Sequence, residues 1–155
     1  MKKLILLLLT VMSLSSNAQE KPEMQVYMVS VLVDDPVKAF KFYTDTLGFE
    51  EVMYMPEAYI AVVKSPLAPN GVNILLEPTG PGGYEWAINF KKEAYALKMP
   101  VITFSCADIQ ETYNRLVAKG VKFKSEPVQK PYGMEAVFDD NNGNFIQLLE
   151  PPKEQ

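Results

Sequence analysis

The spacing of apolar and polar residues predicts the same structural unit twice. Apolar residues alternate over 26–33, which is the period of a β-strand. After Asp35 and Pro36 they recur at steps of three and four, the period of a helix with one buried face. Aspartate is a preferred N-cap and proline is tolerated at the first helical position, so the helix begins here. Gly48 supplies the left-handed residue that ends many helices. The predicted buried stripe is Val37, Phe40, Thr44 and Leu47.

The same order returns in the second half of the chain. A predicted strand over 101–106 is followed by a second aspartate cap, Asp108, and by a helix that Gly120 ends. Glu111 stands three residues after Asp108, which is the spacing of a capping box. The buried stripe of this helix is predicted to be Ile109, Tyr113, Leu116 and Val117.

Short apolar runs between turn-forming residues complete each copy. The further strands are predicted over 50–55, 59–64 and 71–77 in the first copy, and over 121–124, 134–138 and 144–149 in the second. Between the copies we expect a helix over 86–97, with Trp86, Phe90 and Leu97 as its buried residues. The predicted domain is therefore a module over about 26–78, a connecting helix over about 84–98 and a module over about 100–150.

This order predicts an α+β fold of two βαβββ modules. A unit of this size cannot cover both faces of its own sheet, so repeats of this kind dock together. We expect two curved mixed sheets paired around a cleft, with the helices on their outer faces. The sequence leaves open whether the modules pair within one chain or are exchanged between the chains of a homodimer.

The first residues have the features of a secretory signal peptide. Lys2 and Lys3 precede an apolar run over 4–14, and small residues over 16–18 resemble a cleavage site. The apolar run has eleven residues, whereas a membrane helix needs about 20. We therefore expect cleavage near Ala18 and an exported product, periplasmic or secreted, with no stable membrane insertion.

Composition narrows the function further. Without Lys2 and Lys3 the chain has 13 basic and 19 acidic residues, a formal charge of −6, and no basic stripe, so nucleic acid is not an expected partner. The one cysteine, Cys106, cannot form a disulfide within the chain, and we expect it to be a buried, inert thiol. The chain has no histidine, the side chain that most often binds metals or transfers protons near neutral pH.

Three segments resemble the vicinal oxygen chelate superfamily, which includes glyoxalase I, extradiol dioxygenases, fosfomycin-resistance enzymes and bleomycin-resistance binding proteins. They are VLVDDPVKAFKFYTDTLGFE, KEAYALKMPVITFSCADIQETYNRLVAKGVKF and AVFDDNNGNFIQLLEP. The resemblance implies that catalytic members hold a divalent metal between the paired sheets. The corresponding positions of this chain are Met28, Val101, Gln147 and one of Asn73, Leu75 or Glu77. Methionine and valine do not replace imidazole as ligands, so we expect no metal or other cofactor.

Without a metal, the inner faces of the sheets are a candidate small-molecule site, because they are mostly apolar with a few polar groups. The predicted ligand-binding residues are Met28, Ser30, Asn73, Leu75, Trp86, Val101, Thr103, Met134 and Gln147. Trp86, Tyr84 and Phe90 are expected to form a lid, unless this helix packs on a sheet edge or a partner chain instead.

Three functions remain open on this basis. The first is an exported, metal-independent protein that binds a small apolar or aromatic molecule, as the resemblance to the bleomycin-resistance type implies. The second is a lyase, isomerase or dioxygenase-like enzyme with an atypical oxygen-ligand metal, or with Glu77 as its base. The third is a dimer whose cups are closed and whose role is structural.

Overall fold

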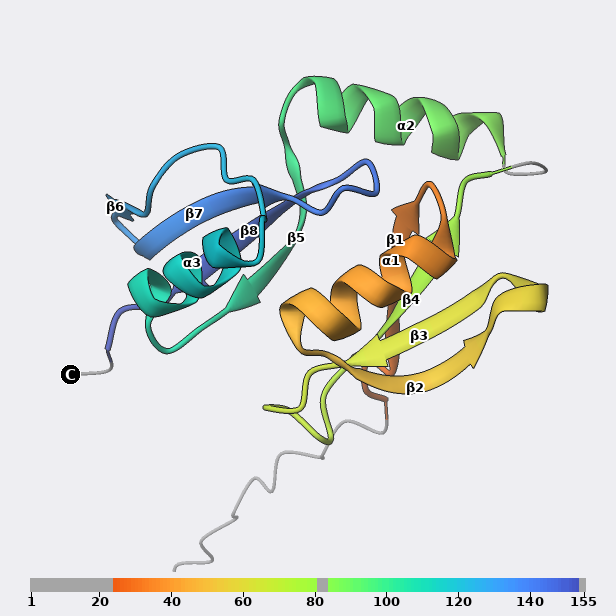
Figure 1. The fold of residues 1–155 in the computed structure, drawn as a ribbon, viewed down its shortest axis with the longest axis horizontal. Coiled ribbons are helices and arrows are strands. Elements are labelled where there is room, and N and C mark those ends of the chain that lie inside the picture. Colours follow the sequence, from red (N-terminus) through yellow and green to blue (C-terminus); the bar gives the residue numbers. More distant parts are fainter. Residues whose placement is uncertain (1–23, 81–83, 154–155) are drawn as a thin grey trace, which may run out of the picture.

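The computed structural model describes residues 24–80 and 84–153, and it confirms the α+β fold (Figure 1). The first module contains β1 (Met28–Val33), α1 (Pro36–Lys41), the π-helical η1 (Phe42–Leu47), β2 (Glu50–Met55), the 3-10 turn η2 (Pro56–Ala58), β3 (Ile60–Lys64) and β4 (Asn73–Pro78). After α2 (Glu85–Ala96), the second module contains β5 (Pro100–Ser105), α3 (Ile109–Ala118), β6 (Val128–Lys130), β7 (Gly133–Asp139) and β8 (Phe145–Glu150). The predicted signal peptide lies outside the described residues.

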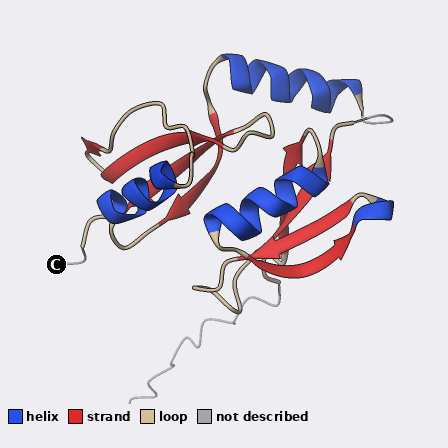
Figure 2. Cartoon of the chain, in the orientation of Figure 1, coloured by secondary structure: helices blue, strands red, loops and turns tan. Residues whose placement is uncertain are grey.

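Two four-stranded mixed sheets form the framework (Figure 2). Sheet A has the strand order β1-β4-β3-β2, and sheet B has the order β5-β8-β7-β6. In both sheets the first strand of the module runs parallel to the last one, while the other neighbours are antiparallel. None of the described helices is long and apolar enough to cross a membrane.

Both predicted aspartate caps are confirmed. Asp35 accepts hydrogen bonds from the backbone amides of Val37 at 2.9 Å and Lys38 at 3.2 Å. Asp108 accepts one from the amide of Glu111 at 2.8 Å. These bonds satisfy backbone donors that the first turn of a helix leaves without partners, so short local signals position both helices.

The first helix changes its winding, which the sequence did not predict. From Phe42 it continues as a π-helix, and Gly48 ends it with φ at 85°. The wider turn brings Tyr43 into the core, whereas Thr44, which we expected to be buried, is only partly covered. The Thr44 hydroxyl instead donates a hydrogen bond to the carbonyl oxygen of Phe40 at 2.9 Å.

The cores of the two modules are continuous. One cluster of buried residues lies between α1 and sheet A, and the other lies between α3 and sheet B. The same partly buried residues pack against both clusters: Phe42, Leu47, Val101, Ile102 and Phe104. The rings of Tyr43 and Phe104 meet edge to face with their centroids 6.3 Å apart. The modules therefore meet on the side of sheet A that carries α1, and Figure 1 shows α1 between sheet A and the second module.

The buried face of α2 differs from the prediction. Trp86, Phe90 and Leu97 were expected to be buried, but they are 66%, 50% and 75% exposed. The buried residues are Ala87, Lys91 and Ala94. The small alanine side chains allow α2 to pack closely on the two modules. The ammonium of Lys91 contacts polar groups at the junction of the modules.

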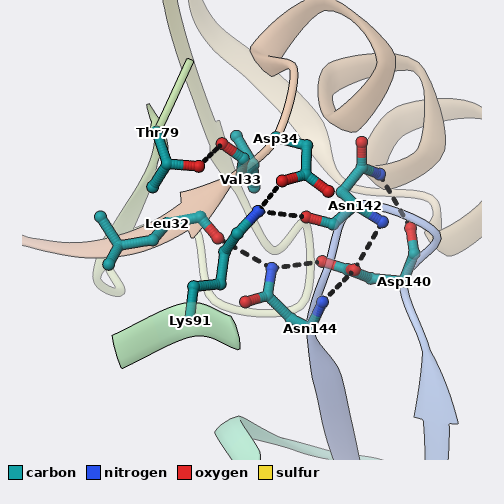
Figure 3. A network of polar contacts seen from close by, with 8 residues as sticks. All are labelled: Leu32, Val33, Asp34, Thr79, Lys91, Asp140, Asn142 and Asn144. Atoms are coloured by element: carbon teal, nitrogen blue, oxygen red, sulfur yellow. Dashed lines mark hydrogen bonds and ion pairs between the residues drawn. The ribbon is translucent and has the colours of Figure 1, made fainter. Parts of the chain in front are cut away.

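Those partners form a network between the modules (Figure 3). The Lys91 ammonium pairs with the Asp34 carboxylate and donates to the carbonyl oxygen of Asn142 at 3.2 Å. The amide of Asp34 donates to the same carbonyl at 3.1 Å. The side-chain amide of Asn144 donates to the carbonyl oxygen of Leu32 at 2.9 Å. The last turn of the second module is thus bound to the end of β1.

The prediction of a regular strand over 121–124 is wrong. In this stretch the structure has one isolated bridge, between Phe123 and Phe138, and the ladder with β7 forms later, at β6. The backbone of Lys122 and Lys124 still bonds to β7, because Phe123 packs its ring on Phe138. Side-chain packing therefore places this segment beside β7 without a regular strand ladder.

Candidate ligand-binding site

Each sheet has one face covered by its helix and one open face. Val31 and Val33 of β1 point into the core below α1, so Ser30 and Leu32 point to the other side. Side chains of four strands align across this open face of sheet A: Ser30 with Leu75, Leu75 with Val62, and Val62 with Met53. On the open face of sheet B, Thr103 lies beside Gln147.

The two open faces are not closed against each other within the chain. The modules meet through their helices and β5, and Ser30, Thr103 and Ser105 are exposed. Within the described residues 24–80 and 84–153, a single copy of the chain therefore does not form the expected cleft between the two sheets.

The structure brings most of the first module's predicted site residues together. Met28 is the neighbour of Asn73, and Ser30 is the neighbour of Leu75, on adjacent strands of sheet A. Glu77 lies two residues after Leu75 on β4. Met28 is 37% exposed, whereas Asn73 is only 8% exposed. These side chains form a mostly apolar surface with isolated polar groups.

A pocket of about 780 Å³ lies at the end of this surface. Leu32 and Glu77 line it from the ends of β1 and β4, and Trp86 lines it from the start of α2. Tyr84 also lines it, and the rings of Tyr84 and Trp86 stack with centroids 6.5 Å apart. Phe90, the third predicted lid residue, is not among the lining residues. We call this space the aromatic pocket.

Sequence reasoning missed the opposite wall of the aromatic pocket. Glu57 and Tyr59 line it from the turn between β2 and β3. Tyr59 is 61% exposed and has a left-handed backbone with φ at 55°. A proline followed by polar and small residues indicates the turn, but no local signal indicates that the turn lies opposite α2.

Two methionines of β2 were also missed. Met53 and Met55 are 47% and 49% exposed, while Tyr54 between them stacks on Phe40 in the core. The alternation of β2 predicts this arrangement once the core side is known. Methionine is flexible and polarizable, so it adapts to ligands of irregular shape.

The open face of sheet B has a chain of polar contacts. The Thr103 hydroxyl donates to Oε1 of Gln147 at 2.7 Å, and Nε2 of Gln147 donates to Glu135 at 2.6 Å. Glu135 also accepts a hydrogen bond from the Tyr132 hydroxyl at 2.7 Å and pairs with Lys130 at 3.4 Å. The bond from Tyr132 lowers the pKa of Glu135; desolvation opposes it, while Gln147 and Lys130 add to it. Glu135 is therefore held as a carboxylate.

Two predicted ligand residues of the second module have other surroundings. Val101 lies at an irregularity of β5 and packs against both core clusters. Met134 packs against the cluster below α3, because its neighbour Glu135 takes the open side of β7. The structure thus does not bring Val101 and Met134 to the surface that carries Thr103 and Gln147.

Cys106 is partly buried and packs against the core cluster below α3. Burial raises the pKa of its thiol above the ordinary value, a hydrogen bond with Thr112 opposes this, and the charges of Glu150 and Asp108 add to it. A raised pKa keeps the sulfur in its less reactive thiol form.

A model of the Glyoxalase/Bleomycin resistance protein/Dioxygenase superfamily matches residues 25–148. The chain belongs to this superfamily. The uncharacterized protein YurT of Bacillus subtilis (strain 168) is 38% identical over 130 residues, which cover 82% of this chain and 99% of YurT. The crystal structure of UcmS2 matches with a TM-score of 0.70 and 32% identity, over 83% of this chain and 99% of UcmS2.

The superfamily fold also occurs in TnmS3, an antibiotic binding protein from Streptomyces sp. CB03234. Its crystal structure matches with a TM-score of 0.63 and 24% identity, over 83% of this chain and 97% of TnmS3. At this identity the match establishes a common fold.

The superfamily's metal does not fit the side chains present. Met28 and Val101 offer no oxygen or nitrogen ligand, and both ends of the Gln147 amide are already hydrogen-bonded. Asn73 and Glu77 lie on sheet A, whereas Gln147 lies on sheet B. In the described part of the chain, no three His, Cys, Asp or Glu side chains gather as a metal-binding group.

Proposed function

We propose that this protein binds a small apolar or aromatic molecule without the aid of a metal. The observation that carries the proposal is the apolar open face of sheet A, which ends in the aromatic pocket of about 780 Å³. Pockets for small organic ligands commonly have volumes of about 300–1,000 Å³, and this pocket lies within that range. The same fold serves TnmS3, which is described as an antibiotic binding protein.

We further propose that a second copy of the chain completes the site. The open face of sheet A is apolar and contains the half-exposed Met28 and Met53, whereas the open face of sheet B carries the polar chain from Thr103 to Glu135. In a two-fold dimer, sheet A of one copy covers sheet B of the other. A ligand then contacts apolar groups on one side and orienting polar groups on the other.

Mixed variants test both parts with Nile red, a neutral apolar dye, as the probe. Leu75→Arg blocks sheet A, and Thr103→Arg blocks sheet B, so neither variant should bind the dye alone. After the two variants are mixed and their subunits exchanged, one cup of each heterodimer is unaltered, which restores about a quarter of the sites. Native mass spectrometry measures the dimers.

A mixture of Leu75→Arg with Ser30→Arg is the matched control, because both changes lie on sheet A and no intact cup results. Circular dichroism checks that each variant folds. Failure of wild-type protein to bind either Nile red or the aromatic cation benzyltrimethylammonium would contradict the binding function. Binding by the wild type without recovery in the first mixture would contradict the shared cup alone.

Catalysis is the second candidate function, since Glu77 lines the aromatic pocket and its carboxylate can accept a proton. Glu77→Gln removes the base while it keeps the shape of the side chain. An enzyme would lose turnover of a bound compound in this variant with little loss of binding, whereas a binding protein would show no turnover before the change.

We also propose that the protein is exported after removal of its first residues. Expression with the leader intact, followed by fractionation and N-terminal sequencing, tests this. The expected product lies outside the cytoplasm and begins at Gln19, and an intact N-terminus in the cytoplasmic fraction would contradict it.

A further inference from the structure

We infer that the aromatic pocket selects a ligand with a cationic group, such as an amine or a quaternary ammonium, on its apolar or aromatic body. This inference rests on the proposed binding function, because it concerns the same pocket. It adds the charge of the ligand, which neither the fold nor the family determines.

Among the described residues, the side chains that line the aromatic pocket and are charged at neutral pH are all negative. Asp34, Asp35, Glu57 and Glu77 contribute carboxylates, and none of the described lysines or arginines lines the pocket. In a concave site with low-dielectric walls, charges of one sign concentrate ions of the opposite sign.

Two of these carboxylates already have partners. Asp34 pairs with the Lys91 ammonium. Asp35 caps α1 and lies 3.6 Å from the Lys38 ammonium. For Glu57 and Glu77, residues 24–80 and 84–153 provide no ion pair and no side-chain hydrogen bond. Two negative charges of the pocket are thus free to meet a cation.

The aromatic walls suit the same kind of ligand. Tyr59, Tyr84 and Trp86 line the pocket and are 61%, 73% and 66% exposed. The faces of tyrosine and tryptophan rings attract organic cations, and the attraction increases when a ligand displaces water from the site. Rings also provide the apolar contact that a small metal ion could not use.

Other occupants match the pocket less well. An anion would be repelled by Glu57 and Glu77. A neutral apolar molecule would use the rings but leave these two carboxylates partly desolvated and without partners. Although four carboxylates line the pocket, no three acidic side chains among the described residues lie close enough together to hold a metal ion, so an organic cation matches the pocket best.

Three probes with the same ring test this inference: benzyltrimethylammonium, benzyl alcohol and phenylacetate. Trp86 is the single tryptophan of the chain, so its fluorescence reports directly on the pocket. We expect the cation to bind about ten-fold more tightly than the neutral probe, and the anion to bind most weakly. Added NaCl should reduce this preference.

The decisive variant is the double change Glu57→Gln and Glu77→Gln. It should remove the preference for the cation and leave the affinity for benzyl alcohol within about two-fold. Glu93→Gln is the control: it changes the net charge on exposed surface of α2, outside the pocket lining, and it should keep the preference.

Several results would overturn the inference. Equal affinity for cation and neutral probe would refute the charge selection while the binding function stands. The same loss in Glu93→Gln as in the double variant would assign the effect to the net charge of the protein. Absence of any Trp86 response, with Nile red still bound, would place the ligand outside this pocket. Should the double variant not fold, a salt-independent preference in the wild type refutes the inference.

Discussion

The ammonium of Lys91 pairs with the carboxylate of Asp34 across 57 residues of sequence, and the burial of the two side chains is unequal. The lysine side chain is 6% exposed, whereas the aspartate side chain is 66% exposed. Replacing Asp34 and replacing Lys91 should therefore lower the free energy of unfolding by different amounts. Without Asp34, the buried ammonium keeps one neutral acceptor among the described residues, the carbonyl oxygen of Asn142. Without Lys91, water can solvate the aspartate.

We predict that Asp34→Asn lowers the free energy of unfolding by about 2–3 kcal/mol, because a buried charge loses its counter-ion. Lys91→Met should lower it by less than about 1 kcal/mol, since methionine fills similar space without a charge. Urea denaturation of both variants at neutral pH measures the difference. Equal costs would show that the buried ammonium does not control this junction.

Gly143 and Gly48 provide a matched pair of substitutions. Their φ angles are 86° and 85°, so alanine is strained equally in both, by about 1 kcal/mol. A Cβ atom at Gly48 would meet no atom within 4 Å, whereas at Gly143 it would lie 2.7 Å from Nζ of Lys91. We predict that Gly143→Ala costs about 1 kcal/mol more than Gly48→Ala.

The extra cost at Gly143 should decrease when Lys91→Met is already present, because the crowded ammonium is gone. A double-mutant cycle in urea tests this coupling. Costs that simply add would show that the crowding at Gly143 arises from other atoms.

The hydroxyl of Tyr43 is buried and has no hydrogen-bond partner among the described residues. Burial raises its pKa well above the ordinary value, and the charge of Asp140 adds to this effect. We predict that Tyr43→Phe leaves stability unchanged or raises it by up to about 1 kcal/mol, since an unpaired polar group is removed. Tyr43→Ala should cost about 3–5 kcal/mol through the cavity it leaves. Thermal and urea unfolding measure both variants, and a loss above about 1 kcal/mol in Tyr43→Phe would reveal a partner for the hydroxyl.

The Asp35 cap should make stability depend on acidic pH. Desolvation raises the pKa of this carboxyl, but hydrogen bonds from the amides of Lys38 and Val37, with the Lys38 ammonium, outweigh it, so the pKa lies below 3.8. A lowered pKa gives stability that is present above the unfolded-state value and is lost as pH falls through the folded-state value. We predict that Asp35→Ala costs about 1 kcal/mol at pH 7 and less below pH 4.

Asp35→Asn is the control, because asparagine also caps a helix and does not titrate. Its stability should stay close to that of the wild type at pH 7 and fall less steeply below pH 4. Unfolding measured from pH 7 to pH 2 gives both curves; parallel curves for the wild type and Asp35→Asn would contradict the prediction.

The parts of the fold that depend on neighbouring residues were predictable from the sequence. Asp35 and Asp108 act within three residues of themselves, so the pattern identifies both caps and the repeated modules. The face of α2 was not predictable, because its ring-bearing side is exposed and its buried side carries Lys91. The burial of Lys91 is recognisable only when its partners, Asp34 and the carbonyl oxygen of Asn142, are known.

The sequence likewise predicts one part of the candidate site and not the other. Alternation along β1 and β4 places Ser30 and Leu75 on one face, as predicted from the sequence. The aromatic pocket depends on the turn with Tyr59 lying opposite Trp86, which is a tertiary relationship between segments far apart in the chain. No periodicity within either segment contains that information.

The edge-to-face contact of Tyr43 with Phe104 has a consequence for how the chain unfolds. Each ring belongs to a different module, so each module alone would expose an aromatic surface that the other normally covers. We therefore predict that the two halves of this duplicated chain do not fold independently. Calorimetry should record one cooperative transition, and two separately produced halves should become ordered only after they are combined.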